Sequence, residues 1–330
     1  MRPILNKQAV VVDGLKIAKR VLEQAGKRID DVREKFDLSH EPRLSIIYAE
    51  NQPDIESFLR QKKKSWEISG SKSSMAIDTI DLSQIKIDRK HDIENLIKGM
   101  NSDARTTAVQ LYLPLKTISS YDEIADILHS ISPLKDVEGA RPSKYLEILR
   151  EPLENTDNLV LPSIYLAVYE VLKEYGVSTK GKRGLLIGQQ FSSIYSLSGL
   201  FGKLGMIHSL WGMPFEDDFQ AKHPHKYEEL KHLLSESDVI ISGFGRSGFI
   251  PEDCVKKGST IIDLAINFDP KTGKIGGDFV SQNLLEKVNL ITPVPKGIGP
   301  ITTAMVFRNL ALLYENQANL KFANRNKVFI

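Results

Sequence analysis

The sequence between residues 291 and 302 reads Ile291-Thr292-Pro293-Val294-Pro295-Lys296-Gly297-Ile298-Gly299-Pro300-Ile301-Thr302. A turn this rich in glycine and proline, leading directly into a helix, lets the backbone approach a ligand and points helix N–H groups at it. A rigid turn between two domains would have a similar composition. Under either interpretation, the turn leads into the last predicted helix, which we place over residues 302–315.

Upstream of this turn, short apolar runs alternate with amphipathic segments. The alternation predicts an α/β fold in which helical crossovers join parallel strands. The predicted strands are residues 10–12, 43–48, 108–112, 184–188, 238–242 and 260–264, and the predicted helices are residues 15–29, 54–68, 93–100, 121–130, 163–175, 194–204 and 302–315. Residues 141–160 lack periodicity, so we place the crossover between two domains there. We expect one domain over residues 1–155, a second over 156–300, and a helix and tail, 301–330, that return to the first domain.

Composition excludes several classes of function. Of the 330 residues, 41% are apolar and 26% are charged, and 44 basic residues nearly balance 42 acidic ones. That balance argues against a nucleic-acid partner. No apolar run approaches the length of a membrane span, and the N-terminus does not read as a secretory signal. The one cysteine, Cys254, fits a reducing compartment and is interpreted as structural. We expect an intracellular protein, cytoplasmic or mitochondrial, without a bound metal.

Four further segments accompany the turn along the chain. They are Val12-Asp13-Gly14-Leu15-Lys16-Ile17-Ala18, Gln110-Leu111-Tyr112-Leu113-Pro114, Lys135-Asp136-Val137-Glu138-Gly139, and Ile262-Asp263-Leu264-Ala265-Ile266-Asn267 with Gly277-Asp278. Together these segments resemble the methylenetetrahydrofolate dehydrogenase/cyclohydrolase family over roughly residues 8–312. The turn is similar to the family's Pro-Val-Pro-Gly-Gly-Val-Gly-Pro-x-Thr, with Lys296 in place of the first of the paired glycines.

The resemblance implies a fold and a reaction. The fold would have an N-terminal α/β folate-type domain and a C-terminal Rossmann-like parallel-sheet domain that binds NADP or NAD. The reaction would be hydride transfer from methylenetetrahydrofolate to that cofactor, followed by hydrolysis of the methenyl cation. The family also implies a homodimer.

The family's catalytic lysine lies four residues after a tyrosine on one helix, and the matching pair here is Phe58 and Lys62. Gln110 matches the glutamine that orients the lysine, and Asp136 is assigned to the aspartate that binds the pterin. We expect Lys62, Gln110 and Asp136 to converge in one cleft, with Phe58 on its wall. Without the tyrosine hydroxyl, Lys62 should be less well oriented and hydrolysis reduced. The expected substrate-binding residues are Phe58, Pro295, Gly297, Gly299 and Pro300.

Each polar residue also has a structural interpretation. Lys62 stands in a lysine triplet and would then be an exposed side chain. The Gln110 side chain would then form hydrogen bonds with backbone groups beside a proline. Asp136 would then cap a turn.

The cofactor loop departs from the family pattern. The family reads Gly-Arg-Ser-x-x-Val-Gly-x-Pro, whereas this chain reads Gly188-Gln189-Gln190-Phe191-Ser192-Ser193-Ile194-Tyr195-Ser196. The loop keeps Gly188, and a later strand keeps Gly243 and Gly245, so the expected cofactor site is degenerate. Ile194 adds bulk where the second glycine would admit a pyrophosphate. We predict that NADP or NAD binds weakly or not at all, unless another segment has taken over binding.

Two hypotheses about function follow. The first is an enzyme of tetrahydrofolate interconversion that acts on a folate-type small molecule, with impaired dehydrogenase activity. The second is a catalytically silent homologue, a pseudoenzyme, that serves as a structural or regulatory subunit of a larger assembly.

Overall fold

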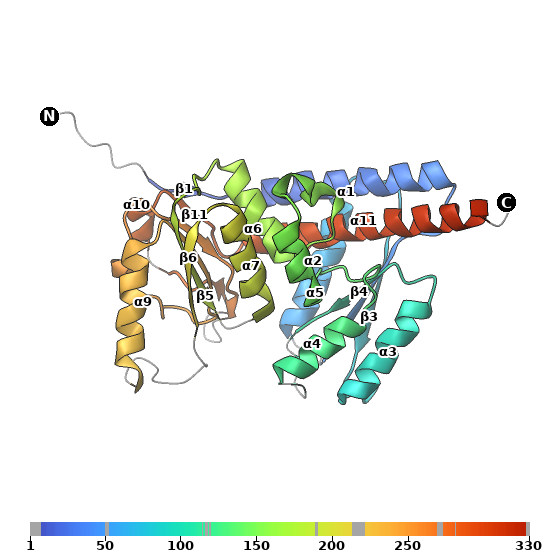
Figure 1. Ribbon diagram of the computed structural model, residues 1–330, viewed down its shortest axis with the longest axis horizontal. Helices are drawn as coiled ribbons and strands as arrows, with labels where there is room; N and C mark the ends of the chain where they lie inside the picture. The colour runs from blue at the N-terminus through green and yellow to red at the C-terminus, as the bar shows by residue number, and fades with distance from the viewer. Residues whose placement is uncertain are drawn as a thin grey trace. The chain divides into compact units, whose positions relative to one another are not determined.

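The computed structural model describes residues 8–49, 53–113, 115, 118, 120–188, 191–212, 222–268, 273–280 and 282–327, without the side chains of residues 53–58, 191–193 and 324–327. The chain divides into two compact units (Figure 1). The small-sheet unit comprises Ala18–Ser163 and Thr303–Ile330, and the large-sheet unit comprises Met1–Ile17 and Ile164–Thr302. Within the described residues, no helix combines the length and apolar character that crossing a bilayer requires.

The small-sheet unit is built on a parallel three-stranded sheet in the order β3-β2-β4. Its central strand is buried, with Leu44, Ile46 and Ile47 at most 1% exposed, as expected for a strand covered on both faces. The elements of this unit are α1 (Gly14–Phe36), which begins in the large-sheet unit, β2 (Arg43–Tyr48), α2 (Pro53–Glu67), β3 (Ala76–Asp81), α3 (Lys90–Ser102), β4 (Ala108–Leu111), α4 (Tyr121–Ser130), α5 (Ser143–Arg150) and the 3-10 helix η1 (Leu153–Asn158).

The large-sheet unit holds a parallel six-stranded sheet in the order β1-β11-β8-β7-β5-β6. Helix α6 ends in a Schellman turn, because Gly176 takes φ +59° and Val177 N donates to Leu172 O at 2.9 Å. Its elements are β1 (Val10–Val11), α6 (Ser163–Glu174), β5 (Arg183–Gly188), α7 (Phe191–Lys203), β6 (Ile207–Trp211), α9 (Pro224–Glu236), β7 (Val239–Gly243), η2 (Glu252–Cys254), β8 (Thr260–Asp263), the antiparallel pair β9 (Asn267–Phe268) and β10 (Ile275–Gly276), α10 (Leu284–Lys287) and β11 (Leu290–Ile291).

Strands β3 and β6 and helix α9 lie outside the elements predicted from the sequence. Two further differences concern the division into domains. Residues 8–17 were expected in the first domain, but Val10 and Val11 of β1 pair with Leu290 and Ile291 of β11 in the large sheet. Residues 141–160 were expected to be irregular, but they contain α5 and η1. The two-domain α/β fold itself is as expected.

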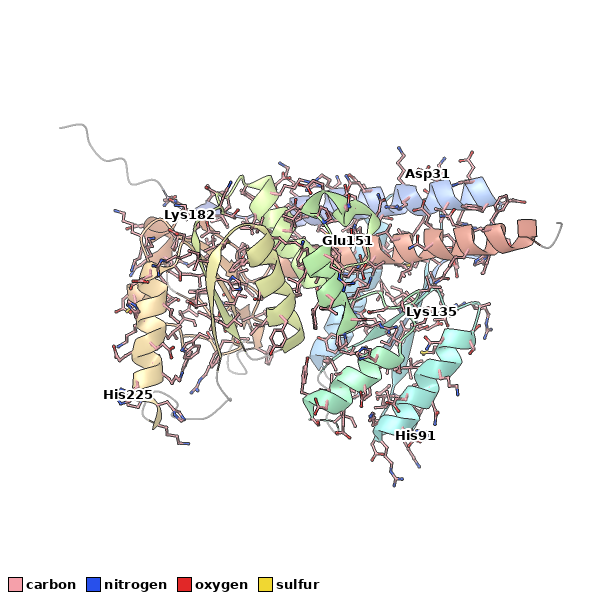
Figure 2. The ribbon with its side chains drawn as sticks, viewed as in Figure 1. Asp31, His91, Lys135, Glu151, Lys182 and His225 are labelled. Carbon is pink, nitrogen blue, oxygen red and sulfur yellow. The ribbon has the colours of Figure 1, made fainter. Side chains whose placement is uncertain are left out.

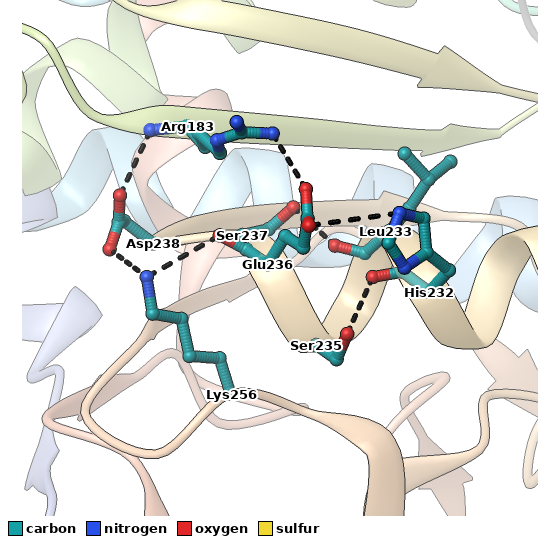
Figure 3. Close-up of polar contacts among 8 residues, drawn as sticks. All are labelled: Arg183, His232, Leu233, Ser235, Glu236, Ser237, Asp238 and Lys256. Carbon is teal, nitrogen blue, oxygen red and sulfur yellow. Dashed lines mark hydrogen bonds and ion pairs between the residues drawn. The ribbon is translucent and has the colours of Figure 1, made fainter.

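A polar network fixes the amino ends of the strands in the large sheet (Figure 3). Asp238, just before β7, accepts hydrogen bonds from Arg183 N at 2.9 Å and from Lys256 Nζ at 2.7 Å. The Arg183 side chain also binds Glu236 at 2.6 Å. These contacts tie β5, β7 and the approach to β8 together at the edge opposite their carboxyl ends, where ligands bind in open parallel sheets.

The long helix α11 (Ile298–Lys327) begins in the large-sheet unit, and from Thr303 it packs within the small-sheet unit. It runs beside α1 (Figure 1), where Arg28 Nε donates to Glu315 at 2.6 Å. Tyr314 donates its hydroxyl to His40 O at 2.6 Å, and the rings of Phe307 and Trp66 lie 5.5 Å apart.

Lys135 anchors the loop that follows α4 (Figure 2). Its buried amine donates to Met100 O and Asp103 O, both at 2.8 Å, and so satisfies carbonyls at the carboxyl end of α3. Burial lowers the pKa of the Lys135 amine. One residue later, Asp136 forms a parallel bridge with Val109, which holds the loop alongside β4.

Candidate functional site

Lys62 points into the small-sheet unit. Its side chain is 1% exposed, whereas Lys63 and Lys64 are exposed. The helical period explains the difference, because Trp66, four residues on, is also buried and marks the inner face of α2. The alternative of an exposed Lys62 is therefore wrong, although the triplet as a whole is mostly solvated.

Gln110 lies on β4 and is 3% exposed. Its Nε2 donates to Glu138 Oε1, in the loop that the bridge between Val109 and Asp136 holds beside the strand. The opposite amide orientation would set two oxygens against each other, so the direction of this hydrogen bond is determined. Gln110 Oε1 is then left buried, and no described side chain or backbone group donates to it. It is an acceptor available to a ligand or to water.

Glu138 completes this cluster. Its Oε2 accepts a hydrogen bond from Ser163 Oγ at 2.5 Å. Burial lowers the pKa of the Lys62 amine from 10.5 to about 8, and the negative charge of Glu138 opposes that fall. An amine with a pKa near neutrality is suited to accepting and returning a proton. We refer to Lys62, Gln110, Glu138 and Ser163 as the lysine cluster.

Asp136 makes a different set of contacts. Its carboxylate accepts hydrogen bonds from the backbone N–H groups of Ala140 at 3.3 Å and Arg141 at 3.2 Å. The side chain is 1% exposed, and burial raises its pKa. These are the contacts of a residue that caps its own turn. The structure thus brings Glu138, rather than Asp136, against Gln110, and a contact of Asp136 with substrate stays a prediction.

Sequence reasoning missed Glu138 because it assigned the loop's acidic function to Asp136. The spacing between Asp136 and Gly139 indicates which of the two carboxylates closes the turn. An aspartate followed by Gly139, which takes φ +59°, favours a turn closed by its own carboxylate. That geometry leaves the next acidic residue to face the sheet. The Phe58 side chain lies outside the described residues, so its place on the cleft wall stays a prediction.

The Gly-Pro turn before α11 is tightly packed. A Cβ added at Gly297 would lie 2.3 Å from Pro293 O, and one added at Gly14 would lie 1.9 Å from Gly297 O. Lys296 takes φ +80°, a left-handed conformation that favours the glycine of the family pattern. Pro295 and Gly299 are exposed. These contacts explain Gly14 and Gly297 by packing. Substrate contacts of Pro295, Gly297, Gly299 and Pro300 stay predictions.

A cavity of about 430 Å³ lies in the large-sheet unit, at the carboxyl ends of β5, β7 and β8. Gly188, Gly243 and Gly245 all line it, together with Ile194 and Ala265. Its volume is in the range of small-molecule sites. The described side chains that line it are all apolar, among them Ile164, Leu264 and Ile266.

The described lining does not fit the phosphates of a dinucleotide. A Cβ added at Gly188 would lie 3.1 Å from Ile194 Cδ1, so the isoleucine packs against the turn where a pyrophosphate would approach. None of the described lining side chains carries a positive charge or a hydroxyl group. Gln189 and Gln190 lie outside the described residues.

Asp278 holds the loop that forms one wall of this cavity. Its carboxylate accepts hydrogen bonds from Phe244 N at 2.8 Å, Gly245 N at 3.0 Å and Arg246 N at 2.9 Å, and from Ser242 Oγ at 2.6 Å. The cavity therefore has a rigid wall made of backbone. Among the described residues, His, Cys, Asp and Glu side chains form no group that would hold a metal ion.

Comparisons with known proteins agree with both units. Residues 12–138 match the profile of the tetrahydrofolate dehydrogenase/cyclohydrolase catalytic domain, and residues 162–318 match that of the tetrahydrofolate dehydrogenase/cyclohydrolase NAD(P)-binding domain. The bifunctional protein FolD of Mesoplasma florum is 30% identical over 312 residues, covering 94% of this chain and 99% of the relative. FolD of Aquifex aeolicus is 28% identical over 309 residues, covering 94% and 96%.

Solved structures share the fold. The FolD crystal structure from Campylobacter jejuni superposes with a TM-score of 0.75 at 24% identity, over 94% of this chain and 99% of that one. The Trypanosoma brucei FolD structure, which contains NADP and an inhibitor, gives 0.78 at 21% identity, over 94% and 98%. With both domain profiles matched in order, and a relative 30% identical along nearly its whole length, the chain belongs to the tetrahydrofolate dehydrogenase/cyclohydrolase family.

Proposed function

We propose that this protein hydrolyses methenyltetrahydrofolate to formyltetrahydrofolate at the lysine cluster, and that its dehydrogenase step is impaired. The observation that carries the proposal is the buried amine of Lys62, whose pKa of about 8 lies near neutrality, beside the carboxylate of Glu138. A buried lysine of this kind is typical of a group that moves protons.

The proposed chemistry uses this chain's own residues. A water oxygen bonds to the methenyl carbon while the neutral Lys62 amine takes the water's proton, which gives a neutral carbinolamine. The protonated amine then returns a proton to one folate nitrogen as its bond to that carbon breaks. The hydroxyl proton leaves to solvent, and the formyl group stays on the other nitrogen.

Two other members of the cluster support this reaction. Gln110 Oε1, which accepts no hydrogen bond from a described residue, is available to accept one from the attacking water. The carboxylate of Glu138 favours a cationic substrate, because opposite charges attract strongly where little water screens them. In the absence of a tyrosine hydroxyl at Phe58, we expect slower turnover than a complete site would give.

The second part of the proposal concerns the cofactor. NADP or NAD is implied by the family, and when bound it would accept a hydride from the substrate. The cavity at Gly188 keeps space but presents apolar side chains, and Ile194 packs on the turn. Hydride transfer to the cofactor is therefore the step that we expect to be impaired.

The test measures hydrolysis and binding separately. Wild-type protein should accelerate the loss of methenyltetrahydrofolate's near-ultraviolet absorbance above the buffer rate. Lys62→Met should lower that acceleration by a factor of about 100 or more, while Lys63→Met, at the exposed neighbouring position, should not change it. Thermal shift should respond to a folate more than to NADP or NAD. If the wild type shows neither turnover nor folate binding, the proposal fails and the silent homologue is the better description.

A further inference from the structure

Asn309 lies in the middle of α11, and its side chain is fully buried at 0% exposure. Its Nδ2 donates two hydrogen bonds, to Val137 O at 2.9 Å and to Leu161 O at 2.8 Å. Its Oδ1 accepts from Arg308 Nη1 at 2.8 Å, which fixes the orientation of the amide. One buried amide thus bridges two loops that are 24 residues apart in sequence (161 − 137).

The two loops are also packed directly on each other. A Cβ added at Gly139 would lie 2.7 Å from the backbone carbon of Leu161. The guanidinium of Arg308 donates to Leu159 O at 2.7 Å and to Thr156 O, so α11 holds the second loop at several points. A shift of either loop would therefore disturb the other, because closely packed backbone has little room to adjust.

The residues that follow these carbonyls belong to the lysine cluster. Glu138 comes directly after Val137, and Ser163 comes two residues after Leu161. The hydrogen bond of 2.5 Å between Ser163 Oγ and Glu138 Oε2 joins the two loops on the side of the cluster. Asn309 joins the same loops from the side of α11.

We propose that Asn309 is a positioning residue for the lysine cluster: by holding Val137 O and Leu161 O together, it sets where the carboxylate of Glu138 lies relative to Gln110 and Lys62. This inference rests on the proposed hydrolysis. Asn309 itself does not touch the reacting atoms; it acts through Glu138.

If the hydrogen bonds of Asn309 only stabilised the fold, its replacement would give a different result. Helix α11 offers a matched control. Gln317, two turns further along, also donates its amide to two backbone carbonyls, Thr107 O and Leu134 O, both at 2.8 Å. Neither carbonyl belongs to a residue adjacent to Glu138 or Ser163. Removing this amide should lower stability without displacing Glu138.

The experiment compares Asn309→Leu with Gln317→Leu in the full-length protein. Two quantities are measured: kcat and KM for methenyltetrahydrofolate hydrolysis, and the pKa of Lys62 from NMR of labelled lysine side chains, assigned with Lys62→Met. Asn309→Leu should lower kcat by about 10- to 100-fold with a smaller change in KM, because a displacement of about 1 Å near reacting groups has such effects. It should also lower the pKa of Lys62 below about 8, because Glu138 would support the charge less. Gln317→Leu should change neither quantity.

The outcomes separate this inference from the proposed function. If the wild type does not hydrolyse the substrate, the proposed function fails, but a fall in the pKa of Lys62 in Asn309→Leu still supports positioning. A pKa that stays constant or rises overturns positioning, as does an equal effect of Gln317→Leu. If Asn309→Leu does not fold, Asn309→Ser, which keeps one donor, should show the same changes at smaller size.

Discussion

Replacing Lys62 by methionine should make the protein more stable while it removes activity. Methionine fills a similar volume without a charge. Each pKa unit corresponds to about 1.4 kcal/mol. The fall in the pKa of Lys62 from 10.5 to about 8 therefore makes the charged amine about 3 kcal/mol less stable in the folded protein than in the unfolded chain. That figure already includes the attraction of Glu138.

The effect has a defined dependence on pH. Below pH 8 the amine is charged in both states, so the wild type carries the whole destabilisation. Between pH 8 and pH 10.5 the folded protein releases the proton before the unfolded chain does, and wild-type stability rises with pH. The advantage of Lys62→Met should therefore be about 3 kcal/mol at pH 7 and about 1 kcal/mol at pH 9.5. Any packing of the lysine side chain that methionine does not reproduce will reduce both values.

The assay can isolate the unit that contains Lys62. The chain has two tryptophans, Trp66 in the small-sheet unit and Trp211 in the large-sheet unit. In a Trp211→Phe background, urea unfolding followed by Trp66 fluorescence monitors a probe within the small-sheet unit. Lys63→Met is the control and should change the free energy of unfolding by less than about 0.5 kcal/mol. A Lys62→Met variant that is less stable at pH 7, or equally shifted at both pH values, would refute the reasoning.

Three further substitutions test other contacts. Asp30→Asn should lower the free energy of unfolding of the small-sheet unit by about 1–2 kcal/mol at pH 7. Burial raises the pKa of the Asp30 carboxyl, but hydrogen bonds from Ser73, Lys72 N and Ser71 outweigh it and leave the pKa lowered. The difference should therefore shrink as the pH falls below 3.8, and a constant difference would contradict this. Asp278→Asn should lower the free energy of unfolding of the large-sheet unit, reported by Trp211, by about 2 kcal/mol or more, and a shift seen with Trp66 instead would count against it. Lys296→Gly should raise stability by about 1 kcal/mol, because it relieves a left-handed conformation; Lys296→Ala, the control, should not.

Much of the fold was predictable because buried strands have a strong sequence signal. Leu44 to Ile47 and Leu185 to Ile187 are largely apolar runs, and both are fully buried strands of parallel sheets. Two edge strands, β3 and β6, were missed for the converse reason. Ile207–Trp211 of β6 has its apolar residues interrupted by His208 and Ser209, and it lies at the sheet's border, where Ile207 is 71% exposed. The partner of β1 depends on a pairing with residues 290–291, which no local pattern encodes.

The candidate site was predictable to a lesser degree. The helical period, read from Trp66, identifies Lys62 as the inward member of its triplet. The choice between Asp136 and Glu138 depends on which carboxylate closes the turn at Gly139. Backbone conformation decides this, and it emerges only when the loop is placed beside β4. The role of Asn309 depends on contacts with Val137 and Leu161, more than 140 residues away (309 − 161 = 148).

The two units differ in how a residue of the candidate site affects the stability of the fold. In the large-sheet unit, Ile194 places an aliphatic side chain against Gly188, which buries apolar surface and stabilises the fold. In the small-sheet unit, Lys62 remains a buried amine whose charged form we expect to be about 3 kcal/mol less stable in the folded protein than in the unfolded chain. Many single substitutions would remove that destabilisation, so a buried amine that interacts electrostatically with Glu138 is more readily explained by use than by inheritance alone. If Lys62→Met is both more stable and inactive, the buried amine lowers the stability of the protein and is needed for hydrolysis. If Lys62→Met is more stable and the wild type is already inactive, the cluster is a relic.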